Sequence, residues 1–329
     1  MKKLFFISLI FSLFFLTGCG KYTEKSIVKD INKKLNQISS YHIEGDMEIY
    51  SGEDVYKYRV KSSFENDNYR VSLTNKSNNH EQIILRNEDG VYVLTPSLNK
   101  TFKFQSDWPE NNSQVYILKS IQNDINDDKK AKLENKNGNY ILTVKVSKTN
   151  NKDLNYQKIY LDKKLNITKI EVFDESNNKQ IVMNYDSVDT KASFNNKYFK
   201  VNENMKTSNE TNTTSTILEE SIYPMFLPSG TYLSDEESVS KEDGDRVILT
   251  FAGESPFILV EESTKKTDEI QITPVYGEPT IISDTVAALS DTSINFISNG
   301  IEYYIASDNL TKQQIIEVAK SINSLPVMK

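Results

Sequence analysis

Apolar and polar residues alternate with a period of two across residues 41–188, and no other feature of the sequence constrains the fold as strongly. The first run has Tyr41, Ile43, Gly45, Met47 and Ile49 at every second position, and Ser51-Gly52-Glu53-Asp54 after it has the composition of a hairpin turn. Further short runs, separated by Asn, Asp, Gly or Pro, lie at residues 56–64, 69–73, 82–86, 91–95 and 100–104. This pattern predicts one antiparallel meander in which successive strands pair.

Two segments with a helical period interrupt the strands. Residues 22–38 and 113–126 each repeat apolar residues at spacings of three or four, which predicts two amphipathic helices. Strands resume at residues 130–134, 139–147, 156–162, 167–174 and 180–188. A sheet of this size tends to curl on itself. The expected fold is therefore α+β: a curved antiparallel half-barrel with lid helices over its open face, plus a second, smaller α+β domain.

The predicted domains are a signal peptide at residues 1–18, a first domain at 19–200, a polar linker at 201–217 and a C-terminal domain at 218–329. Residues 202–216 are almost free of apolar side chains and predict a flexible linker that lets the domains reorient. Short strands follow it, and Thr311 with Gln314 predicts a capping box at the start of a last helix. Residues 217–329 hold 19 acidic and 7 basic residues, a net charge of −12 against −7 for the whole chain. This balance, with no basic run, argues against a nucleic-acid partner.

The first twenty residues have the pattern of an export signal. Lys2 and Lys3 precede an apolar run at residues 4–16, which is too short to span a bilayer as a helix. Leu16-Thr17-Gly18-Cys19 follows, and Cys19 is the only cysteine, so no intramolecular disulfide can form. The alternative is an ordinary signal peptide followed by a chance cysteine.

Leu16-Thr17-Gly18-Cys19 resembles the lipobox of bacterial lipoproteins, whose cysteine is acylated with chains such as palmitate and becomes the new amino terminus. Residues 22–200 resemble the LolA/RseB-like lipoprotein-carrier fold, and more closely its branch in Gram-positive spore formers, the GerS and YdcC type. The likeness rests on the lipobox, on Ser40-Tyr41 at the first strand and on residues 107–116, DWPENNSQVY. The C-terminal domain resembles one attached to YdcC-like proteins, through residues 223–230, 253–257 and 299–304.

The resemblance implies an exported, noncatalytic protein, anchored to the outer face of the cytoplasmic membrane of a Gram-positive bacterium through acylated Cys19. Its expected role is that of a binding or scaffold protein in sporulation, germination or envelope assembly, with an envelope protein, such as a cortex amidase, as its partner. Carriers of this fold hold acyl chains in the concave face of the sheet. A carrier or sensor of acyl-chain ligands or lipoproteins is therefore the second hypothesis, and it requires an apolar cavity of several hundred Å³ beneath residues 113–126. The third is an envelope hydrolase.

Motifs for catalysis are not found in the sequence. His42 and His80 have no metal-ligand spacing, and the chain lacks GxSxG, SxxK and a glycine-rich phosphate loop. Carboxylates such as Asp245 and Glu261-Glu262 could serve a glycosidase, but such pairs are also expected by chance in an acidic domain. We therefore expect no catalytic residue, no metal site and no cofactor.

Trp108 is the only tryptophan and precedes a proline at the start of the second predicted helix. It either gates the cavity or anchors a partner, since tryptophan is favoured at binding hot spots, or it fills the seam between helix and sheet. The predicted partner or cavity contacts are Trp108, Val115, Leu118 and Ile121.

Overall fold

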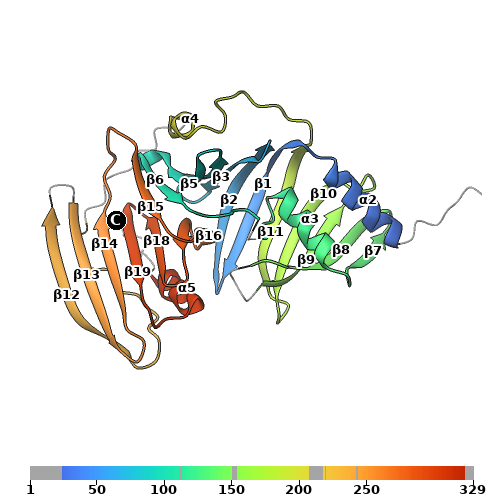
Figure 1. Cartoon of the computed structure of the whole chain (residues 1–329). Coiled ribbons are helices and arrows are strands. Elements are labelled where there is room, and N and C mark those ends of the chain that lie inside the picture. Colours follow the sequence, from blue (N-terminus) through green and yellow to red (C-terminus); the bar gives the residue numbers. More distant parts are fainter. Residues whose placement is uncertain are drawn as a thin grey trace, which may run out of the picture.

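The computed structural model describes residues 24–110, 113–149, 154–206, 218, 220–241 and 244–322. These residues form two open sheets, and most of the helices lie against their faces (Figure 1). The α+β fold class expected from the sequence is confirmed. Within the described ranges, no helix combines the length and the apolar character needed to cross a membrane. The signal peptide and Cys19 lie outside the described residues.

The first sheet has twelve strands in the order β15-β6-β5-β4-β3-β2-β1-β11-β10-β9-β8-β7. Apart from β15, neighbouring strands are antiparallel, as the alternation predicts. Eleven of these strands come from residues 40–189: β1 Ser40–Ser51, β2 Asp54–Glu65, β3 Asn68–Asn75, β4 Glu81–Asn87, β5 Gly90–Thr95, β6 Lys100–Phe104, β7 Lys132–Lys136, β8 Asn139–Lys145, β9 Leu154–Leu161, β10 Ile167–Asp174 and β11 Lys179–Asp189. A short 3-10 turn, η2 Pro96–Leu98, joins β5 to β6.

Helices α2 (Glu24–Asn36) and α3 (Leu118–Asp127) cover one face of this sheet (Figure 1). The side chains of Ile27, Ile31, Ile121 and Ile125 join those of β1 to β10 in one core. Helix α3 begins at Leu118, five residues later than the apolar spacing predicts. Residues 113–117 are not helical, and hydrogen bonds to Asp124 hold the start of this segment in place. The carboxylate of Asp124 accepts hydrogen bonds from the Ser113 hydroxyl at 2.8 Å and from the Ser147 backbone N–H at 3.0 Å.

The second sheet has seven strands in the order β12-β13-β14-β19-β18-β17-β16. Their bounds are β12 Thr231–Lys241, β13 Gly244–Gly253, β14 Phe257–Ser263, β16 Glu278–Ile282, β17 Thr285–Leu289, β18 Ser293–Ser298 and β19 Ile301–Ala306. Helix α5 (Lys312–Ser321) packs on one face through Ile315, Val318 and Ala319. The capping box predicted for Thr311 and Gln314 is present, because each side chain bonds the backbone N–H of the other residue.

The two units are docked together, contrary to the expectation that the linker lets them reorient. Strand β15 (Gln271–Val275) leaves the second unit and pairs in parallel with β6 at the edge of the first sheet. The Gln82 side-chain oxygen accepts a hydrogen bond from the Val286 backbone N–H at 2.7 Å, and Lys100 pairs with Glu302 at 2.8 Å. Residues of β17 and β18 also enter the core of the first unit. The segment expected as linker starts with a helix, α4 (Val201–Met205), packed on the opposite face of the first sheet.

A buried carboxyl in the second unit makes its stability depend on pH. Glu261 on β14 is fully buried, and burial raises its pKa from 4.5 to about 7. The pKa of Glu261 is thus higher in the folded protein than in the unfolded chain, so the free energy of unfolding falls as the pH rises from about 4.5 to about 7. The full decrease is reached above pH 7. A shift of this size corresponds to about 3 kcal/mol.

Glu261→Gln is expected to raise the free energy of unfolding by about 2–3 kcal/mol at pH 8, with no gain near pH 4.5. Urea unfolding followed by circular dichroism at both pH values measures this difference. Glu262→Gln is the matched control, because Glu262 faces the opposite side of β14 and pairs with Arg246. An equal gain at both pH values would contradict the assignment.

Candidate functional site

The four residues predicted as partner or cavity contacts are all buried. Trp108 is 0% exposed and packs edge-to-face against Tyr69, with ring centroids 5.9 Å apart. Val115, Leu118 and Ile121 lie in the same core, between the helices and the sheet. The structure thus brings the four side chains into one cluster on the concave face, away from solvent. A role in contacting a partner stays a prediction for them, as does acylation of Cys19.

A small cavity lies at the concave face, between the first unit and the docked second unit. Its volume is about 130 Å³, and its lining includes Met47, Val115, Ile281 and Lys320. Pockets that hold drug-sized ligands have volumes of about 300–1,000 Å³. This cavity is therefore smaller than the one the carrier hypothesis requires.

A much larger groove lies on the opposite, outer face of the first sheet. Its volume is about 960 Å³, and it is bordered by β1 to β4, by residues 195–198 and by α4. Alternation explains its lining, because the strands that bury Ile43, Val60 and Val71 inward must turn the side chains between them outward. The outward side chains include His42, Glu44, Lys61, Arg70 and Ser72.

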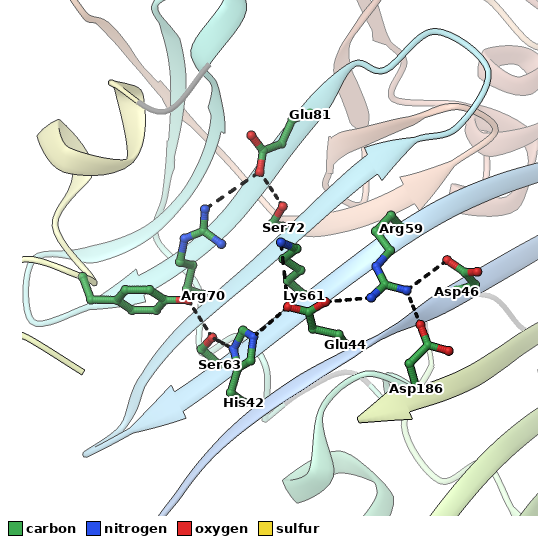
Figure 2. Close-up of polar contacts among 11 residues, drawn as sticks. His42, Glu44, Asp46, Arg59, Lys61, Ser63, Arg70, Ser72, Glu81 and Asp186 are labelled. Carbon is green, nitrogen blue, oxygen red and sulfur yellow. Dashed lines mark hydrogen bonds and ion pairs between the residues drawn. The ribbon is translucent and has the colours of Figure 1, made fainter. Parts of the chain in front are cut away.

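A network of fixed charges centred on Glu44 borders one half of the groove, and His42, Glu44 and Lys61 of this network line it (Figure 2). Its carboxylate lies 2.7 Å from the Arg59 guanidinium, 3.3 Å from the His42 ring and 3.8 Å from the Lys61 amine. The hydrogen bond from Arg59 lowers the pKa of Glu44. Arg59 also contacts Asp46 and Asp186, so one guanidinium links β2 to β1 and β11. Charge-assisted bonds of this kind fix the positions of the side chains in the network.

The other half of the groove is bounded by residues 194–206, which cross the outer face (Figure 1). Arg70 is buried and donates a hydrogen bond from Nε to the Asn204 side chain at 2.5 Å. Its guanidinium also lies over the Tyr198 ring at 5.6 Å. The neighbouring Phe194, Phe199 and Met205 form an apolar cluster on β4 and β5. These contacts fix the crossing segment as one wall of the groove.

Ser63, His42 and Glu44 form a chain of hydrogen bonds with the order of a hydrolase triad. The His42 ring nitrogens lie 2.9 Å from the Ser63 hydroxyl and 3.3 Å from Glu44. A nucleophile must reach its substrate, yet Ser63 is 0% exposed and its hydroxyl also bonds Tyr198. The backbone around Ser63 is paired on both sides, to β1 and β3, and so supplies no free N–H groups for an oxyanion. The described residues also contain no group of three or more His, Cys, Asp or Glu able to hold a metal ion.

The sequence indicated part of this groove. The alternation that buries Ile43 and Val60 places His42, Arg59 and Lys61 on the other face of the sheet. The acidic partners Glu44, Asp46 and Asp186 were not predicted, although the same alternation places Glu44 and Asp46 beside His42. The position of residues 194–206 could not be predicted from the local sequence. This segment is held by contacts with strands more than a hundred residues earlier, such as those of Asn204 with Arg70 and of Phe199 with Asn87.

Comparison with known proteins supports the expected resemblance. The family described as "Sporulation protein YdcC-like" matches residues 1–199. The curated "Sporulation protein YdcC" of Bacillus subtilis (strain 168) is 33% identical over 318 residues, which cover 95% of this chain and 94% of that protein.

Two solved structures share only a distant likeness with the chain. One is from the Pseudomonas aeruginosa MucA/MucB complex, with 12% identity, 89% of this chain and 98% of that chain covered, and a TM-score of 0.31. The other is the LolA superfamily protein NE2245 of Nitrosomonas europaea, with 14% identity, 54% and 98% covered, and a TM-score of 0.30. Similarity this weak implies nothing about activity. The match to the family and the identity to its curated member decide the assignment: the chain belongs to the YdcC-like family of sporulation proteins.

Proposed function

We propose that this chain is an exported, lipid-anchored scaffold of the sporulating envelope that binds a protein partner and breaks no bonds. The observation that carries the proposal is the contrast between the two faces of the first sheet. The concave face is filled by its own core and by the docked second unit, which leave a cavity of about 130 Å³. The outer face keeps an open groove of about 960 Å³ with charges fixed in place.

Surface recognition explains this groove better than storage of an acyl chain. Glu44 and Lys61 present both signs of charge along a wide, open surface. Charge arrays of this kind select a partner by complementarity and speed its association. An acyl chain would instead require an enclosed apolar pocket. A cortex amidase stays among the candidate partners, and the groove itself does not identify which envelope protein binds.

Site-specific cross-linking in sporulating cells tests the proposal. A photoreactive amino acid at position 61, inside the groove, is expected to yield a discrete adduct with one envelope protein. The matched control is position 136, because Lys61 and Lys136 are both exposed but Lys136 lies on β7, at the far edge of the sheet. Lys61→Glu is expected to lower capture of that protein about tenfold, and Lys136→Glu to leave it unchanged.

Two results would contradict the binding role. One is stoichiometric fatty acid, bound noncovalently to the purified protein, which would favour a carrier. The other is turnover of cell-wall fragments by the purified protein, which would favour a hydrolase.

A further inference from the structure

Strand β12 forms the free edge of the second sheet, on the side away from the first sheet (Figure 1). Among the described residues it pairs only with β13, from Thr231 opposite Gly253 to Lys241 opposite Gly244. Residues 232–238 are exposed without interruption. On the core-facing side of the strand, the Glu236 carboxylate accepts hydrogen bonds from the Ser221 and Tyr223 hydroxyls, whereas Tyr232, Asp235 and Glu237 lie on the other side. Every second residue of an edge strand points its N–H and C=O away from its neighbour, and this row is open to pairing with another chain.

The other three sheet edges carry features that discourage such pairing. Strands β7, β15 and β16 have five residues each, whereas β12 has eleven. Strand β15 contains Pro274 and β16 contains Pro279, and proline removes a donor from the edge. Strand β7 begins and ends with lysine. Strand β12 has no proline, and its pairing with β13 is interrupted by one bulge, between Leu233 and Asp235. Its acidic run at residues 235–237 discourages pairing with an acidic strand but not with a basic one.

Apolar and acidic side chains share the outward face of the sheet beside this edge. Tyr232, Ile258 and Tyr304 are 60%, 37% and 38% exposed. Asp235 and Glu237 of β12 lie on the same face, because they pair across β13 with Thr250 and Ile248, whose neighbours Leu249 and Phe251 point into the core. A strand added here would therefore meet an acidic row flanked by apolar surface.

The negative charge of the second unit determines which kind of strand can pair with β12. The second unit carries a net charge of −12 over residues 217–329. A second copy of β12 would set the acidic run at residues 235–237 near its own like charges, which is destabilising. Lysine or arginine opposite Asp235 and Glu237 would be favourable for the same reason.

We propose that β12 is a docking edge for an extended, lysine- or arginine-rich segment of a partner protein, which adds to the second sheet as a further strand. Backbone pairing would supply affinity, while the alternate basic and apolar side chains would supply specificity. The proposal deepens the proposed binding role by naming a second surface and the chemistry of its partner. Binding here and capture at the groove are measured separately, so either can fail alone.

A short, dye-labelled peptide of alternating lysine and valine is the probe, and fluorescence anisotropy with the full chain in detergent micelles is the measurement. Asp235→Lys/Glu237→Lys is expected to weaken binding about tenfold. The matched control is Asp291→Lys/Asp308→Lys, which changes the net charge equally at two exposed positions off β12. A peptide N-methylated at every second residue is expected to bind about tenfold more weakly, because it cannot complete the backbone ladder.

Four results would contradict the proposal. Equal losses in the edge and control variants would indicate nonspecific attraction to an acidic protein. Equal affinity for the N-methylated peptide would exclude strand addition. If the wild-type chain does not bind the lysine–valine peptide, β12 is not a docking edge for a basic strand. Self-association that disappears in the edge variant would make a second copy the occupant instead.

Discussion

Cys19→Ala is expected to abolish acylation and to release the protein from the membrane. Cys19 is the only cysteine, so no other thiol can take the lipid. The proposed anchor is the acyl group carried by the Cys19 thiol, and alanine at this position cannot carry it. A diacylated amino terminus supplies two apolar chains, and stable anchoring requires two such signals. Nearly all of the variant protein should therefore leave the membrane fraction.

Fractionation of cells producing the wild-type chain or Cys19→Ala measures this release, with Gly20→Ala as the matched control. A variant that retains its uncleaved signal would stay on the membrane for an unrelated reason. Mass spectrometry of the amino-terminal peptide separates the two cases. A bare thiol at Cys19 in the mature wild-type protein would contradict lipid anchoring.

The strand pattern was predictable because it depends on local chemistry. Alternation from Tyr41 to Ile49 requires one buried face, and β1 has that face. The cap at Thr311 and Gln314 likewise depends on side chains three residues apart, and it marks the start of α5 as expected. In both places the residues that decide the element lie within one short segment of the sequence.

The docking of the two units could not be predicted from local patterns. Strand β15 contains Pro274, which argues against a strand, and it forms only because it lies at an edge where the missing N–H is not needed. Its partner β6 lies about 170 residues earlier in the chain. Helix α4 is also held by distant contacts, such as that between Arg70 and Asn204.

The groove was only half predictable for a related reason. Alternation fixes which side chains leave the core, and so it places Arg59 and Lys61 outside. Alternation does not predict which strand lies beside β1. Asp186 can contact Arg59 only because β11, which carries Asp186, pairs with β1. A charge array spread over three strands therefore requires the sheet order, which only the structure supplies.

Trp108→Ala is expected to lower the free energy of unfolding by about 3–5 kcal/mol, the largest stability change we expect from any single substitution discussed here. Trp108 is 0% exposed, and its ring lies against Tyr69, which in turn packs on Phe64 with centroids 4.7 Å apart. Its indole Nε1 has no hydrogen-bond partner among the described residues, so the loss comes from packing.

Urea unfolding followed by circular dichroism measures the loss, and Trp108→Phe is the control that keeps an aromatic ring and should lose less than half as much. If Trp108 instead anchors a partner, the alanine variant would keep its stability and lose only capture of that partner. A loss below about 1 kcal/mol together with impaired capture would therefore move Trp108 from the core to the binding surface. A large loss in stability assigns it to the seam between the sheet and the segment that leads into α3, where its burial places it.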